Sequence, residues 1–235
     1  MKLTLVQQML QARQAKQPFA LLTWLDNGRE CLLRLDASGD TGGVDLPADF
    51  TAQVRQAILD DNSGLLETEN GRVFVHVFQP PLRLLIVGAV HIAQALIPVA
   101  RLLGYQITLI DPRQAWAAES RFAGVSISTQ WPDEALLELA PDTRTAIVTL
   151  SHDPKLDDPA LKVALDSPAF YIGALGSRRT HATRLQRLQE SGLEQAALAR
   201  IHAPIGLDIG AKSPAEIALS IMAELTQTLR RGGAA

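Results

Sequence analysis

The sequence predicts an α/β protein in which a doubly wound, mostly parallel sheet follows a smaller N-terminal α+β domain. Two consecutive prolines, Pro80 and Pro81, force an extended link that no helix can cross. Before this link, a helical segment precedes a hairpin signal and short strands. After it, short apolar runs alternate with helical segments, which is typical of a parallel sheet covered by helices. We therefore expect domains at residues 1–79 and 82–235.

Composition places the chain among globular proteins. Of its 235 residues 47% are hydrophobic, enough for a full core, and only 20% are charged, which argues against disorder. The net charge of −3 argues against nucleic-acid binding, which needs a strongly basic face. Cys31 is the single cysteine and excludes an internal disulfide. Without a signal-peptide core or an apolar run of about 18 residues, we expect a cytoplasmic protein that does not enter a membrane.

The N-terminal segment carries a strong hairpin signal. Asn27-Gly28 lies between two apolar runs, and a type I′ turn favours this pair because both central residues need positive φ. The expected elements are a helix at 3–16 with Leu3, Val6, Met9 and Leu10 on one side, strands at 18–25 and 30–35, a loop at 38–43, a helix at 50–59, a turn at 69–71 and a strand at 72–78.

The C-terminal segment reads as alternating strands and helices. Pro98 should kink or break the first helix. The expected strands lie at 82–87, 106–110, 125–128, 145–150, 170–173 and 201–203, and the helices at 92–103, 133–140, around 161–165, 178–190 and 213–230.

The first strand of this segment leads into Gly88 and His91, the position of a Rossmann-type phosphate turn. Gly88 can make the tight turn and Ala93 can pack the helix on the strand. Val90 occupies the place where bare backbone would approach a diphosphate, so the fingerprint is degraded. A packed turn without a ligand is the alternative.

An acid near the end of the second strand strengthens the case for a ligand. Asp111 follows Gly88 by 23 residues, close to the spacing of about 20 at which a carboxylate binds ribose hydroxyls. Arg113 follows it and suits a phosphate. The alternative is an aspartate that starts a turn before Pro112.

Polar groups crowd the end of the fourth strand. His152, Asp153 and Lys155 are expected at the ligand crevice, where His152 beside Asp153 could relay a proton or contact a ligand. The alternative is that Asp157 or Asp158 caps the next helix, with Pro159 at its start. A cap would account for one aspartate but not for the other three groups.

The fifth strand ends in a segment that predicts an anion site. Gly173 and Gly176 leave backbone bare, Ser177 can cap the next helix, and Arg178 and Arg179 begin it. Arginines at a helix start oppose its dipole unless an anion compensates them. The alternative is a solvated basic face that continues through Arg184 and Arg187.

A glycine-rich loop with His202, Gly206 and Asp208 follows the last strand and is expected to contact the ligand. Ser213 and Glu216 after it form a capping box, so Glu216 should be structural. Three histidines at strand ends, His91, His152 and His202, could converge on zinc, but no pair has a recognised ligand spacing, so we expect no metal site.

Four segments, in this order and spacing, resemble the XdhC/CoxI family: GAVHIAQAL from Gly88, LSHDPKLDDPAL from Leu150, FYIGALGSRRTHATRL from Phe170 and RIHAPIGLDIGAKSPAEIALSI from Arg200. The resemblance runs from about Val73 to Leu229. It implies a Rossmann-fold domain behind a smaller one. It also implies an accessory protein that binds molybdenum cofactor (molybdopterin), protects it during sulfuration and delivers it to xanthine dehydrogenase or a related molybdenum hydroxylase. A cysteine desulfurase is a further implied partner.

If molybdopterin is the ligand, the hypothesis that follows is that the anion site at Gly173–Arg179 takes its phosphate and that His152, Asp153 and Asp208 hydrogen-bond its pterin. Two positions depart from the family pattern. Val90 replaces a glycine of the G-A-G-H turn, and Leu25–Arg29 replace a G-S-[SA]-P-R segment.

Two other functions compete with the accessory role. An NAD(P)-dependent oxidoreductase would use His152 or Lys155 for proton transfer; Asp111 favours this and Val90 opposes it. An interaction module with a lapsed pocket is opposed by the polar loops. Edge strands in the N-terminal hairpin make a homodimer plausible.

Overall fold

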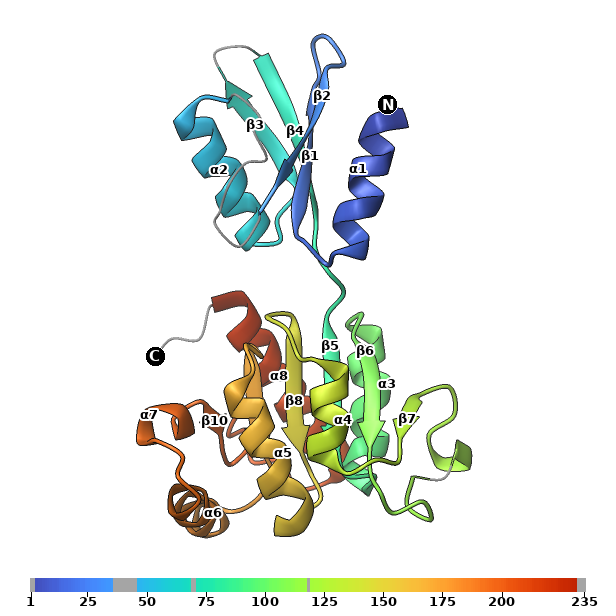
Figure 1. Cartoon of the computed structure of the whole chain (residues 1–235), viewed down its shortest axis with the longest axis vertical. Helices are drawn as coiled ribbons and strands as arrows, with labels where there is room; N and C mark the ends of the chain where they lie inside the picture. Colours follow the sequence, from blue (N-terminus) through green and yellow to red (C-terminus); the bar gives the residue numbers. More distant parts are fainter. Residues whose placement is uncertain (1–2, 36–45, 69–70, 118, 232–235) are drawn as a thin grey trace. The chain divides into compact units, whose positions relative to one another are not determined.

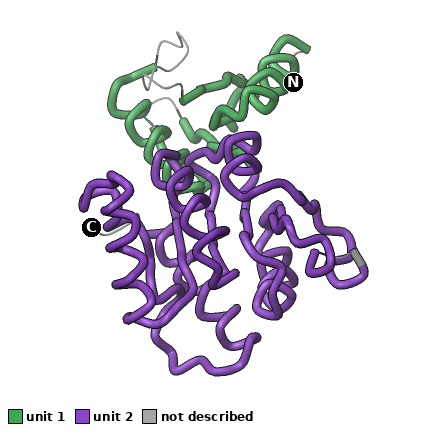
Figure 2. The backbone as a smooth tube through the Cα atoms, turned by 60° about the horizontal axis from the view of Figure 1, so that its bottom comes forward, with its two compact units in different colours: residues 1–80 green, residues 81–235 purple. Residues whose placement is uncertain are grey.

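The chain forms two compact units, Met1–Pro80 and Pro81–Ala235 (Figure 2). The computed structural model describes residues 3–35, 46–68, 71–117 and 119–231. The loop expected at 38–43 and most of the turn expected at 69–71 lie outside these ranges. Each unit has its own sheet and its own core.

The first unit is a four-stranded antiparallel sheet in the order β2-β1-β4-β3 (Figure 1). Its elements are α1 (Leu3–Gln14), β1 (Phe19–Trp24), β2 (Glu30–Arg34), α2 (Ala48–Leu59), β3 (Gly64–Thr68) and β4 (Gly71–Phe78). The β1–β2 hairpin is confirmed, but its turn is not type I′. Positive φ occurs at Gly28 and not at Asn27, and Trp24 and Arg29 close a four-residue connection.

Alternate side chains of β1 serve opposite faces of this sheet. Ala20 and Leu22 pack with α2 through Val54 and Ile58. Phe19 packs with α1 on the other face, through Leu5 and Ala12. The apolar side expected for α1 is partly wrong, because Leu3 and Leu10 are exposed.

The second unit is a six-stranded parallel sheet in the order β10-β9-β8-β5-β6-β7. Counted along the chain, this is the 3-2-1-4-5-6 order of a Rossmann fold, which confirms the predicted fold class. Its strands are β5 (Arg83–Val87), β6 (Gln106–Ile110), β7 (Ser126–Ser128), β8 (Thr145–Thr149), β9 (Tyr171–Ala174) and β10 (Ile201–His202).

Helices cover both faces of the parallel sheet (Figure 1). The helices are α3 (His91–Leu102), α4 (Pro132–Leu139), α5 (Pro154–Asp166), α6 (Arg178–Glu190), α7 (Gln195–Leu198) and α8 (Pro214–Arg231), with a 3₁₀ turn at Glu119–Arg121. The strands β5 and β8 are buried on both sides, which explains why they are continuous apolar runs. One core packs α3 and α8 on the sheet, and the other packs α4, α5 and α6.

Local signals at the helices were partly misleading. Pro98 lies inside α3, which continues to Leu102, so the predicted break is absent. The short helix α7 and the strand β3 carry no pattern strong enough to predict them. The capping box is confirmed, because Glu216 accepts the Ser213 amide at 2.8 Å and donates its own amide to Ser213 Oγ at 3.3 Å.

Within the described ranges, every helix is too short or too polar to cross a lipid bilayer.

Candidate functional site

The strand order reverses between β5 and β8, and the loops after these strands touch. A side chain on Gly88 would lie 2.8 Å from the Ser151 amide nitrogen, and Gly88 has a φ of +109°. Only glycine combines this positive φ with the lack of a side chain that the close approach requires, since L-residues rarely adopt this backbone region. Gly88 therefore makes room for the Ser151 backbone.

Asp111 directly follows β6, and its side chain holds the turn after β5 by a hydrogen bond. Its carboxylate is fully buried and accepts the Ala89 amide at 2.8 Å. It also accepts the amide of Arg113 at 3.0 Å and two guanidinium donors of Arg113 at 2.9 and 2.7 Å. These four donors use all the lone-pair positions of a carboxylate. In this arrangement Asp111 holds the turn and Arg113, and no acceptor remains for the predicted ribose contact.

The loop after β8 leads into α5 through a side-chain cap. Asp153, and neither Asp157 nor Asp158, caps α5, because its Oδ1 accepts the Lys155 amide at 2.9 Å. Pro154 begins the helix, so the predicted start at Pro159 is wrong. His152 is exposed and has a φ of +60°, a conformation that non-glycine residues adopt at an energetic cost.

The start of α6 matches the prediction. Ser177 is the N-cap, and its Oγ accepts the Thr180 amide at 3.1 Å. The amides of Arg178 and Arg179 precede the first intrahelical hydrogen bond and point beyond the helix end. No acidic residue lies in this first turn.

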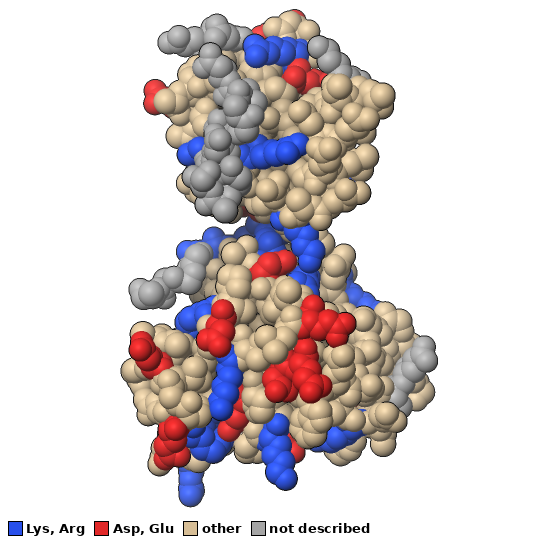
Figure 3. Space-filling model, in the orientation of Figure 1, with Lys and Arg blue, Asp and Glu red and all other residues tan. Residues whose placement is uncertain are grey.

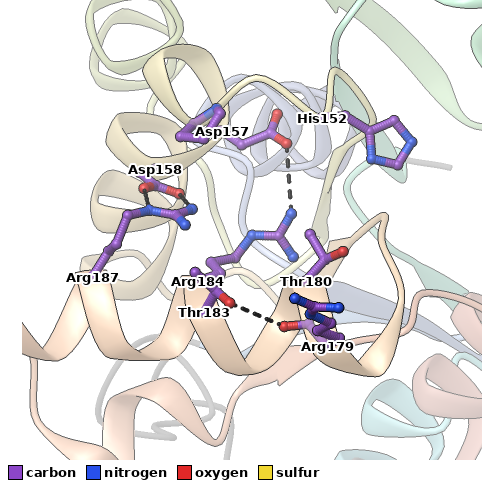
Figure 4. A pocket seen from close by; sticks show the side chains of 9 residues that line it. His152, Asp157, Asp158, Arg179, Thr180, Thr183, Arg184 and Arg187 are labelled. Carbon is purple, nitrogen blue, oxygen red and sulfur yellow. Dashed lines mark hydrogen bonds and ion pairs between the residues drawn. The ribbon is translucent and has the colours of Figure 1, made fainter.

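A cavity of about 270 Å³ lies between the β8–α5 loop and α6 (Figure 4). Basic and acidic side chains mingle on the surface of the second unit around these helices (Figure 3). The cavity is lined by His152, Pro154, Asp157, Asp158, Arg179, Thr180, Thr183, Arg184 and Arg187.

Two arginine–aspartate pairs join α5 and α6 beside the cavity, and they differ in quality. Arg187 binds Asp158 with two hydrogen bonds, at 2.7 and 3.0 Å. Arg184 lies 3.7 Å from Asp157 and makes no hydrogen bond to it. Instead, Asp157 accepts the Ser151 hydroxyl at 2.6 Å, and Arg184 donates to the Leu175 carbonyl at 2.9 Å.

Arg184 is 2% exposed, yet its Nε and Nη1 have no hydrogen-bond partner among the described residues. Burial lowers the pKa of Arg184, and the charges of Asp157 and Asp158 offset this only in part. Burial raises the pKa of Asp157, and the bond from Ser151 and the charge of Arg184 only partly reverse that. The cavity thus contains a buried cation with unused donors and a weakened counter-charge.

Comparison with known proteins places this geometry in a family. The XdhC Rossmann domain matches residues 84–225. The chain belongs to the XdhC Rossmann domain family. Escherichia coli (strain K12) PaoD, named a molybdenum cofactor insertion chaperone, is 34% identical over 148 residues, which are 63% of this chain and 40% of PaoD. A Bacillus subtilis (strain 168) protein, named as a probable subunit of xanthine dehydrogenase, is 31% identical over 160 residues, 68% of this chain and 46% of that protein.

A solved structure shares the fold of both units. A protein from Bacillus halodurans, described as a xanthine dehydrogenase, aligns with 98% of this chain and 68% of its own, with a TM-score of 0.71 and 24% identity. The chain spans less than half the length of the curated relatives that it matches.

Two glycines predicted to bind cofactor in this XdhC domain instead make room for neighbouring residues. A side chain on Gly173 would lie 2.5 Å from Ile205 Cδ1 and 2.7 Å from Tyr171 Cε1. Gly206 lies against α8, where a side chain would collide with Ser220 Oγ, and its amide donates to Glu224 at 2.7 Å. At both glycines, neighbouring residues of the chain therefore fill the space that was predicted to be open for a ligand.

His202 belongs to a separate polar group. Its Nδ1 lies 3.2 Å from Glu224 Oε1, its ring stacks on Tyr171 at 4.5 Å, and the Tyr171 hydroxyl donates to Glu224 at 2.5 Å. This group joins β9 and β10 to α8. The described residues contain no cluster of three or more His, Cys, Asp or Glu side chains suited to a metal ion.

Of the predicted site residues, the structure brings only His152 and Arg179 to the cavity. Three predicted residues lie together after the carboxyl ends of β5 and β6: Gly88, Asp111 and Arg113. Two others are helix caps, Asp153 and Ser177, and Gly176, with a φ of +143°, precedes α6. Four lie outside the cavity: His91, Lys155, Arg178 and Asp208.

Sequence reasoning missed Arg184, Asp157, Thr180 and Thr183 as cavity residues. The alternative interpretation, a solvated basic face that continues through Arg184, is wrong at this residue, because Arg184 is buried with Leu188, one turn further on. An arginine on the apolar stripe of a helix was the available signal.

Replacing Gly173 should destabilise the fold. The added carbon of Gly173→Ala overpacks the site against Ile205 and Tyr171, which should lower the free energy of unfolding by about 1–3 kcal/mol in urea denaturation. In a double-mutant cycle with Ile205→Val, which shortens the clashing side chain, the combined loss should be smaller than the sum of the two single losses. Unchanged stability would show that Gly173 is free for a ligand.

Asp111→Asn should lower the free energy of unfolding by about 2 kcal/mol at neutral pH, because the hydrogen-bonded charge pair with Arg113 is lost. Burial raises the pKa of Asp111, but hydrogen bonds from Arg113 and Ala89 outweigh it, so the pKa lies below its usual value. The wild-type advantage should therefore hold above about pH 4 and shrink as the pH falls through the folded-state pKa. Asp208→Asn, outside this turn, is the matched control, and an advantage that persists in acid would contradict the assignment.

Proposed function

We propose that this chain is a cytoplasmic accessory protein that binds molybdenum cofactor and helps its insertion into xanthine dehydrogenase or a related molybdenum hydroxylase. The observation that carries the proposal is the buried, under-bonded Arg184 in a Rossmann unit similar to PaoD, a molybdenum cofactor insertion chaperone. The similarity to a protein named as part of a xanthine dehydrogenase supports the class of recipient.

The residues around the cavity fit one end of the cofactor. Molybdopterin is a fused heterocycle with a terminal phosphate, and a guanidinium with free donors matches a phosphate. The cavity of about 270 Å³ is smaller than typical pockets for whole ligands, which span roughly 300–1,000 Å³. It suits the phosphate end and leaves the heterocycle to exposed strand-end groups such as His152. The bound cofactor supplies the redox chemistry of the recipient, and this chain has only to hold and shield it.

The finer parts of the proposal concern partners. Protection during sulfuration calls for contact with a sulfur donor such as a cysteine desulfurase. A homodimer would form through β2 or β3, since each has one edge unpaired within the described sheet of the first unit. These assemblies are proposed on the family resemblance.

An NAD(P)-dependent oxidoreductase is the second candidate, and the Rossmann strand order favours it. Two features of the turn after β5 count against it. The lone pairs of Asp111 are used by protein donors, and Val90 at the start of α3 packs on the apolar core where a diphosphate would approach.

Cofactor retained by the purified protein tests the proposal. Protein isolated from cells that make molybdenum cofactor should release a stoichiometric pterin on denaturation, measured as oxidised-pterin fluorescence, and should capture a molybdenum hydroxylase in pull-downs. Protein from cells unable to make the cofactor is the control. NAD(P) found by nucleotide mass spectrometry, without pterin, would instead establish the oxidoreductase, and the absence of both pterin and recipient would overturn the accessory role.

A further inference from the structure

We propose that the cavity between the β8–α5 loop and α6 is a subsite for a phosphate ester, in which Arg184 is the fixed cation and Arg179 the one that closes on the ligand. The phosphate therefore binds at α6 and not at the Gly88 turn before α3. The inference deepens the proposed function and rests on it for the identity of the ligand, but not for the chemistry that the cavity recognises.

Arg184 supplies the main argument. Its side chain is 3% exposed and lines the cavity, while its Nε and Nη1 have no acceptor within the described chain. A buried donor on a charged group is costly when unpaired. In Figure 4 the guanidinium lies between Asp157 and Thr180, so it reaches the space between the two helices. Phosphate oxygens would give both nitrogens the acceptors that they lack.

The N-terminal end of α6 adds backbone N–H donors to the same space, independently of Arg184. Ser177 caps the Thr180 amide, which leaves the amides of Arg178 and Arg179 without an intrahelical acceptor. Arginines at this end oppose the helix dipole, and an anion removes the conflict. Of these two arginines only Arg179 lines the cavity, so the structure separates two residues that the sequence presents as equivalent.

The charges around the cavity leave an excess of positive potential. Arg187 and Asp158 neutralise each other in a two-bond pair. Arg184 and Asp157 do not, because they are 3.7 Å apart and Asp157 is bonded to Ser151. Burial also raises the pKa of Asp157, which weakens it as a counter-ion. No described carboxylate pairs with the Arg179 side chain, which stays available for an incoming anion.

The turn before α3 offers no comparable site. The Ser151 backbone fills the space that a side chain of Gly88 would need, because a Cβ on Gly88 would lie 2.8 Å from the Ser151 amide nitrogen. Val90 is the N-cap of α3 and makes no side-chain cap. The close approach that a diphosphate normally makes at this turn is therefore taken up by protein.

Calorimetric titration with inorganic pyrophosphate tests the subsite. Arg179→Ala should weaken binding about tenfold, the loss expected for one charge-assisted contact. Arg178→Ala is the matched control: it removes the same charge one residue away but outside the cavity, and its affinity should stay within about twofold of wild type. Val90→Gly should also leave pyrophosphate affinity unchanged.

The test of Arg184 uses a double variant, so that Asp157 is not left as a buried charge without its counter-ion. Arg184→Met combined with Asp157→Asn removes both charges and should abolish pyrophosphate binding, with the fold checked by circular dichroism and urea denaturation. If this variant does not fold, the contrast between Arg179→Ala and Arg178→Ala decides alone. Equal weakening by those two variants, undiminished binding by a folded Arg184→Met/Asp157→Asn protein, or no binding by wild type would each overturn the subsite.

The result is distinguishable from failure of the proposed function. Wild type that binds pyrophosphate but carries no pterin would keep the subsite and overturn the cofactor role. Pterin retained equally by wild type and Arg179→Ala, with no pyrophosphate bound by either, would keep the cofactor role and overturn the subsite.

Discussion

The approach of Gly88 to the backbone of Ser151 is the contact on which the site depends. It joins the loops after β5 and β8 at the point where the strand order reverses, and only a glycine with positive φ permits it. Ser151, so placed, donates its hydroxyl to Asp157 on α5. Asp157 faces Arg184 on α6, and Arg184 in turn holds the Leu175 carbonyl after β9. One steric constraint at the sheet centre thus propagates through polar contacts to the cavity.

The sequence was sufficient for features that depend on neighbours along the chain. Continuous apolar runs predicted the buried strands, because a parallel sheet covered on both faces leaves no polar side. Ser177 and the arginines after it predicted the start of α6, because a cap and its amides are local. Asp157 and Arg184 were not predicted as a pair, since they meet only when α5 packs on α6.

The glycines also show that the sequence alone does not reveal contacts between elements distant along the chain. In sequence, Gly173 looks like backbone left bare for a ligand, but the missing side chain is occupied by Ile205. Gly206 likewise accommodates α8 at Ser220. A glycine reports that something approaches closely, and only the fold tells whether a ligand or another part of the chain does so.

The two arginine–aspartate pairs between α5 and α6 explain why the site has unused binding capacity. Arg187 and Asp158 are partly exposed and joined by two hydrogen bonds, so they hold α5 and α6 together without a further partner. Arg184 and Asp157 are deeply buried at the same interface, where an imperfect pair costs desolvation that its attraction does not recover. A pair needed only to join the helices would be expected to close as the first does. Its open geometry leaves two guanidinium nitrogens without a partner among the residues that the structure describes, which is what a site needs when the last partner of the arginine comes from outside the chain.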